Sequence, residues 1–231
     1  MQSGENKNND VLRLTKVDML IMLDHTFLKE NDECYFIFEY TPKAGFSYSN
    51  ANQLISNLKK SPKKRGQPEY FYKSVAIAQC GLYLSATLTP YDIQSATFVP
   101  VPCSKSIDDD EYDDRMERVC KAIQPNVDVR NIVFQKQSTI ASHSAPVGGR
   151  QTIQQLEENY RIDETKCTPR PKSIIIIDDM LTTGAHFKAM QNVLSQRFPG
   201  VPIKGIFIAR RELLDQDDYI LQMLESSDEL E

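Results

Sequence analysis

The stretch that decides the fold is Ser173-Ile-Ile-Ile-Ile-Asp-Asp-Met-Leu-Thr-Thr-Gly-Ala185. Its four consecutive isoleucines are β-branched and do not alternate with polar residues, which is typical of a strand buried on both faces. Such strands occur in parallel sheets that have helices on both sides. The run ends at two adjacent carboxylates and a short loop, and a helical pattern follows over residues 185–197. The stretch therefore predicts an α/β protein built on a parallel sheet.

The residues after the isoleucine run suit a sugar phosphate. Backbone N–H groups in a short loop that leads into a helix form an anion site. Thr182, Thr183 and Gly184 add hydroxyl donors and room for a phosphate to approach closely. Asp178 and Asp179 suit ribose hydroxyls, or a hydrated Mg2+ that those hydroxyls help to hold. The alternative is a buried strand followed by an acidic turn and an ordinary helix.

Outward from this stretch, strands alternate with helices from residue 70 onward, which predicts a mostly parallel twisted sheet flanked by helices. We expect strands over residues 33–40, 96–101, 127–134 and 203–209, and helices over 50–60, 69–88, 112–123, 151–159 and 213–224. We expect three parts: a disordered tail (1–10), a small N-terminal hood (11–68) and the α/β core (69–231).

Composition excludes several classes of protein. The 231-residue chain has a net charge of −5 and a pI near 5.4, which disfavours a general nucleic-acid or anionic-membrane binder. A local basic cluster over residues 59–65 leaves a nucleic-acid-linked role open. The five cysteines form no Cys-x-x-Cys pair, so a structural zinc site is not expected. With no long apolar run and a polar start that lacks a signal-peptide core, we expect a cytoplasmic location.

The string of four hydrophobic residues, two acidic residues, two further residues and Thr-Thr-Gly resembles the phosphoribosyl-pyrophosphate (PRPP) motif of type I phosphoribosyltransferases. Other features add to this: Val-Pro-Val-Pro at 99–102, the segment 150–163 and the strand at 203–209. Over residues 35–211 the chain looks most like the competence protein F-type (ComF-like) phosphoribosyltransferases.

This resemblance implies an Mg2+-dependent enzyme that transfers the phosphoribosyl group of PRPP to a nitrogen nucleophile, which the sequence does not identify. It implies catalytic roles for Asp178, Asp179 and Lys105, with Mg2+ held near the two aspartates through ribose and water. The loop over residues 136–150 would cover the site, and a homodimer is one assembly that the resemblance allows. The implied PRPP contacts are Cys103, Ser104 and Lys105 in the pyrophosphate loop, and Asp178, Asp179, Met180, Leu181, Thr182, Thr183, Gly184 and Ala185 in the central motif.

The chain departs from these relatives in ways that bear on function. It lacks their N-terminal Cys-rich zinc element, and an acidic run at 108–114 stands where they have a basic stretch. Purine-salvage relatives often have an aspartate at the position of Thr182, so hypoxanthine and guanine are not the expected acceptors. The acidic run also leaves open a second function, in which a regulatory protein senses PRPP or a nucleotide without catalysis.

Overall fold

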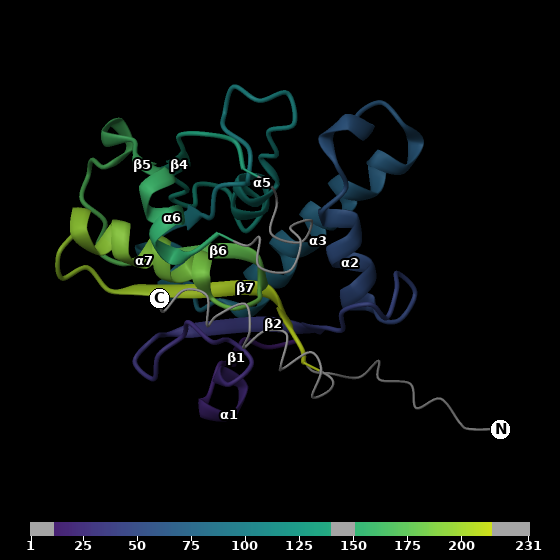
Figure 1. The fold of residues 1–231 in the computed structure, drawn as a ribbon, viewed down its shortest axis with the longest axis horizontal. Coiled ribbons are helices and arrows are strands. Elements are labelled where there is room, and N and C mark those ends of the chain that lie inside the picture. The colour runs from purple at the N-terminus through teal and green to yellow at the C-terminus, as the bar shows by residue number, and fades with distance from the viewer. Residues whose placement is uncertain (1–11, 140–150, 214–231) are drawn as a thin grey trace.

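The computed structural model describes residues 12–139 and 151–213. Its main sheet has five strands in the order β1-β2-β7-β6-β3. Their bounds are Thr15–Lys16 (β1), Cys34–Tyr40 (β2), Thr97–Pro100 (β3), Ile174–Leu181 (β6) and Ile203–Arg211 (β7). The β1 strand is antiparallel to β2, and every other neighbouring pair is parallel. Figure 1 shows β2 and β7 lying side by side. The expected α/β fold with a mostly parallel sheet is confirmed.

Seven α-helices lie within the described residues. They are α1 (Met19–Met22), α2 (Asn50–Leu58), α3 (Phe71–Thr87), α4 (Pro90–Ser95), α5 (Arg115–Lys121), α6 (Ile153–Asn159) and α7 (Ala185–Arg197). Short 3-10 turns cover Pro62–Lys64 (η1), Pro68–Tyr70 (η2) and Glu164–Lys166 (η3). None of the helices in these two described ranges has the length and apolar character that crossing a bilayer requires.

The isoleucine strand is buried on both faces, as its sequence predicts. All four isoleucines are fully buried. Ile174 and Ile176 pack in a cluster that includes apolar residues of α6 and α7, whereas Ile175 and Ile177 pack in a second cluster with residues of α2, α3 and α5. Successive side chains of a strand point to opposite faces, so the uniform run supplies both cores at once. Figure 1 shows α2 and α3 together, away from α6 and α7.

The strand expected over 127–134 is wrong over most of its length. Only Val133–Gln135 forms a strand (β4), and it pairs antiparallel with β5 (Tyr160–Ile162) in a separate two-stranded sheet. Val129 makes only an isolated bridge to Phe98. The Arg130 side chain donates to the carboxylate of Asp128 at 2.7 Å and to the backbone of the 166–169 loop. The segment lies along the edge of β3, where the Phe98 N–H donates to the Asp128 carbonyl at 2.8 Å and the Arg130 N–H donates to the Phe98 carbonyl at 3.0 Å.

The N-terminal segment joins the main sheet directly, since β2 pairs along its length with β7. Three expectations concern residues outside the described ranges: the tail over 1–10, most of the covering loop over 136–150, and all but the first residue of the helix over 213–224.

Candidate functional site

The loops that follow β3 and β6 leave the same edge of the sheet. Pro100 pairs with Ile177 in the parallel ladder, and the Val101 N–H donates to the Ile177 carbonyl at 2.9 Å. Asp178 and Asp179 come next on β6, while Pro102 begins the loop after β3. The topology thus places the predicted acidic pair and the predicted pyrophosphate loop at neighbouring strand ends, where α/β proteins bind ligands.

The turn between β6 and α7 is held from one side by residues 25–28, which we call the strap. His25 Nδ1 hydrogen-bonds to the Thr182 carbonyl, and the Phe27 N–H donates to the Thr183 carbonyl at 2.9 Å. Gly184 has φ +89, in the left-handed region, and a Cβ there would lie 2.9 Å from Leu28 Cδ2. Glycine is therefore required both by the backbone conformation and by the close approach of the strap.

The strap contacts determine which way the amide groups of the turn point. In a planar trans peptide, the carbonyl of one residue and the N–H of the next point in opposite directions. Because the carbonyls of Thr182 and Thr183 face the strap, the N–H groups of Thr183 and Gly184 face away from it. Neither of these two N–H groups donates to any protein group in the described part of the chain. They lie at the N-terminus of α7, where the helix dipole favours negative charge.

Helix α7 is itself anchored to the N-terminal segment. The Lys188 ammonium, buried on α7, donates to both carboxylate oxygens of Asp32 at 2.8 and 2.9 Å. Asp32 is also buried. A buried, bidentate ion pair of this kind fixes the position of the helix relative to the strap.

Asp179 is a buried carboxylate that holds two cations. Its Oδ1 lies 2.9 Å from Lys59 Nζ, and its Oδ2 accepts from Arg115 Nε at 2.9 Å and from Arg115 Nη2 at 2.6 Å. Burial opposes ionisation of Asp179, but the two cations lower its pKa below the ordinary range. In this arrangement Asp179 serves as the counter-ion of Lys59 and Arg115.

The same ion network continues to the segment before α5. Arg115 Nη1 donates to Asp113 Oδ2 at 2.8 Å, and the fully buried Lys73 donates to the same oxygen at 2.7 Å. Lys73 also donates to the carbonyls of Leu58 and Lys60 at the C-terminal end of α2, at 2.8 and 2.7 Å. The network therefore connects α2, α3, α5 and the end of β6.

Asp178 differs from its neighbour in being half-buried and in having no ion pair with a cation of residues 12–139 or 151–213. Its Oδ1 accepts from the Asp179 N–H at 2.8 Å. Burial, together with the nearby Asp179 charge, raises the pKa of Asp178 above its ordinary value. His186 lies on the first turn of α7, and its Nδ1 shares a hydrogen bond of 2.9 Å with the Tyr160 hydroxyl. Burial lowers the pKa of His186 to about 4. Asp178 is thus the carboxylate available to a ligand at this edge.

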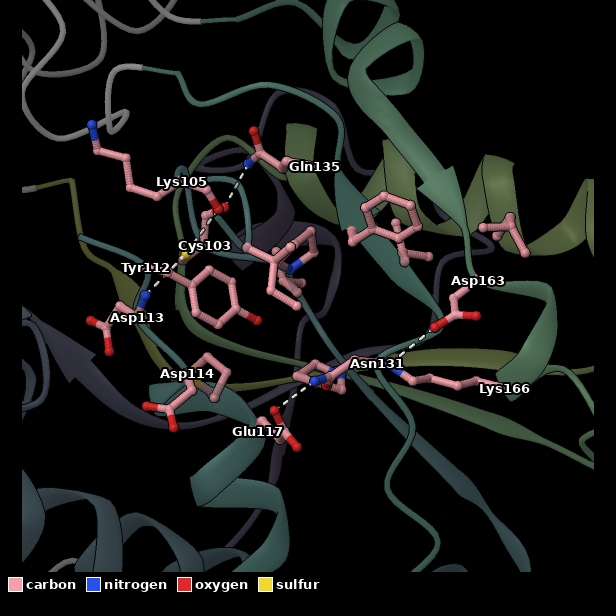
Figure 2. Close-up of a pocket in the computed structure, with 18 of the residues that line it drawn as sticks. Cys103, Lys105, Tyr112, Asp113, Asp114, Glu117, Asn131, Gln135, Asp163 and Lys166 are labelled. Atoms are coloured by element: carbon pink, nitrogen blue, oxygen red, sulfur yellow. Dashed lines mark hydrogen bonds and ion pairs between the residues drawn. The ribbon is translucent and has the colours of Figure 1, made fainter. Parts of the chain in front are cut away.

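A separate cavity of about 440 Å3 lies beyond the loop after β3. Among the predicted site residues, Cys103 and Lys105 line this cavity. Ser104 and residues 178–185 are not among the described residues that line it. Figure 2 shows the Lys105 side chain extending away from the Tyr112 ring. Lys105 Nζ lies 3.8 Å from Asp109 Oδ2. The structure therefore brings the acidic pair and the turn together, and places Lys105 beside a different hollow.

Sequence reasoning missed the partners of the acidic pair. In the sequence, Lys59 belongs to the basic cluster over residues 59–65, and Arg115 directly follows the acidic run. Every member of the basic cluster has a protein partner: Lys59 pairs with Asp179, Lys60 with Asn57, Lys63 with Glu111, Lys64 with Glu69, and Arg65 with the Tyr112 carbonyl. The strap has no recognisable sequence signal, because one of its two contacts to the turn uses a backbone N–H, that of Phe27, and the other uses the ring of a single histidine, His25.

Residues 12–139 and 151–213 contain no group of three or more His, Cys, Asp or Glu that could hold a metal ion. Comparison with models of known protein families finds no match to this chain, and comparison with curated proteins finds none either.

Proposed function

We propose that this chain is an Mg2+-dependent phosphoribosyltransferase of the type I class, similar to the ComF-like enzymes. It would bind PRPP and transfer the phosphoribosyl group to a nitrogen nucleophile. The observation that supports this best is the turn after β6, whose Thr183 and Gly184 N–H groups face away from the strap at the N-terminus of α7. Two outward N–H groups at a helix N-terminus suit a phosphate monoester.

The sugar would lie between this turn and the end of β6. The 5′-phosphate is received by residues 182–185, and the ribose hydroxyls donate to the half-buried Asp178, whose Oδ2 is not used in the contact with the Asp179 N–H. Asp179 lies beside Asp178 and brings Lys59 and Arg115 to the same place. Cys103, Ser104 and Lys105 would contact the pyrophosphate from the loop after β3, which requires Lys105 to leave Asp109 and the separate cavity that it lines. Catalysis then consists mainly of positioning and charge stabilisation.

The residues present fit Mg2+ that arrives with the substrate. Mg2+ commonly keeps several waters and binds through one or two carboxylates together with substrate phosphates. Asp178 and Asp179 are the two carboxylates at this edge, and they would hold the ion through ribose oxygens and water. When bound, Mg2+ offsets the charge of the leaving pyrophosphate.

Calorimetric titration with PRPP and Mg2+, followed by a pyrophosphate-release assay on a panel of nitrogen bases, tests the proposal. We expect binding and release with at least one base, and loss of release in Asp178→Asn and in Asp179→Asn. Asp110→Asn is the matched control, because Asp110 is an exposed carboxylate of the acidic run. Failure of PRPP to bind would contradict the proposal.

A second candidate, a regulatory protein that senses PRPP without catalysis, is favoured by one observation: Asp179 is already engaged by two cations. Tight binding without release on any base would support the sensor and exclude the enzyme. The acidic run, which motivated this alternative, is partly neutralised, because Asp109, Glu111 and Asp113 each pair with a lysine or arginine.

A further inference from the structure

We propose that Lys59 and Arg115 bind the pyrophosphate group of PRPP, together with Lys105, and that Asp179 holds these two cations in place until the ligand arrives. The inference rests on the proposed function, which by itself leaves the pyrophosphate with a single cation, Lys105. It assigns a binding role to a residue at the end of α2 and to the first residue of α5, neither of which belongs to the motif that follows the isoleucine strand.

The charges in the network favour an anion. In the ion pairs of the described residues, three cations, Lys59, Lys73 and Arg115, meet two carboxylates, Asp113 and Asp179; the adjacent Asp178 forms no ion pair there, and its pKa is raised. The carboxylate side chains are 8% and 5% exposed. A charge without a partner is costly in such surroundings, and a bound anion would balance it.

Exposure separates the cations that can reach a ligand from the one that cannot. The side chains of Lys59 and Arg115 are 24% and 18% exposed, whereas Lys73 is fully buried with three acceptors. An ammonium has about three N–H donors and a guanidinium about five. Lys59 uses one on Asp179, and Arg115 uses three on Asp113 and Asp179. Both cations therefore keep donors for phosphate oxygens while still bound to their carboxylates.

The position of these cations matches that of a leaving group. Asp179 follows Ile177 by two residues, and Ile177 is bonded to the start of the loop after β3 through the Val101 N–H. Asp113, the second partner of Arg115, has its N–H 3.4 Å from Cys103 Sγ in that loop. The two cations thus lie at the end of β6 that leads into the turn, and Arg115 is linked through Asp113 to the loop after β3.

Calorimetry with three ligands tests this inference: inorganic pyrophosphate with Mg2+, PRPP with Mg2+, and ribose 5-phosphate. In Lys59→Met we expect the affinity for pyrophosphate and for PRPP to fall about tenfold, since one charge-assisted contact is lost. The affinity for ribose 5-phosphate should stay at the wild-type value. Lys60→Met is the control for removing a neighbouring lysine, and Lys59→Arg should restore most of the loss. Lys59 is the residue chosen for substitution. Arg115→Met would remove the cation that bridges Asp113 and Asp179, and the repulsion between these two buried carboxylates risks misfolding.

Three results would overturn the inference while leaving the proposed function intact. These are unchanged pyrophosphate affinity in Lys59→Met, an equal loss of ribose 5-phosphate affinity in that variant, and a wild-type protein that binds ribose 5-phosphate but not pyrophosphate. A wild-type protein that binds none of the three ligands would contradict both.

Discussion

Replacing Lys73 with methionine should destabilise the protein strongly, because Lys73 is fully buried and has three acceptors. Its ammonium donates to Asp113 and to the carbonyls of Leu58 and Lys60. Methionine preserves much of the side-chain volume but supplies no donor. Asp113 keeps Arg115 as a partner, while both carbonyls lose the ammonium as a donor. Removing one partner of a buried ion pair costs about 3–5 kcal/mol.

For a chain of this size, that loss corresponds to a fall in melting temperature of about 10 °C. Chemical unfolding measures the free energy and thermal unfolding the melting temperature, with Lys60→Met as the control. The double variant Lys73→Met/Asp113→Asn should be less destabilised than the sum of the two single variants, because removing the charged partner relieves part of the penalty. A loss below about 1 kcal/mol in Lys73→Met, or strictly additive effects, would show that Lys73 is hydrated and the network is not a unit.

Three further predictions concern the strap, the turn and the strand. Burial lowers the pKa of His25 to about 4, so as pH falls below 6.5 the histidine is protonated in the unfolded chain before it is protonated in the folded one. Between pH 7 and pH 4 the free energy of unfolding of wild type should therefore fall by about 3 kcal/mol relative to that of His25→Asn. A difference between the two proteins that does not change with pH would refute this. Gly184→Ala should lower both stability and ribose 5-phosphate affinity, whereas Gly200→Ala, at φ +78 with nothing within 4 Å of the added Cβ, should affect stability only; equal binding in both variants would contradict the role of the turn. Ile175→Ala and Ile176→Ala should each cost about 2–5 kcal/mol in urea unfolding, because their side chains enter opposite cores; a large loss in only one variant would mean a strand covered on one face.

The parts of the fold that sequence predicts well are those encoded by local patterns. Four uninterrupted isoleucines require apolar cover on both faces, and the structure supplies it with two separate clusters. The helix after Gly184 and the parallel strand at 203–209 follow from the same local reading. By contrast, the expected strand over 127–134 divides in two: Val129 forms a single bridge to Phe98 of β3, and only the last two residues of the range belong to β4.

The site residues that sequence does not predict are joined by long-range contacts. Lys59 and Arg115 meet at Asp179 although they lie far from it in the chain, and no local pattern distinguishes Lys59 from the adjacent Lys60. The orientation of the turn is likewise set by long-range contacts, from the His25 ring to the Thr182 carbonyl and from the Phe27 N–H to the Thr183 carbonyl. Only the tertiary structure shows that the acidic run before α5 is partly neutralised by cations.

The central claim, that the turn after β6 binds the 5′-phosphate of an activated sugar, is tested most directly by NMR of the backbone amides. A titration of 15N-labelled protein with ribose 5-phosphate should shift the Thr183 and Gly184 amide resonances in a saturable manner, while ribose without phosphate should leave them unchanged. If ribose 5-phosphate binds and these two amides do not move, or if no binding occurs at all, the account is contradicted.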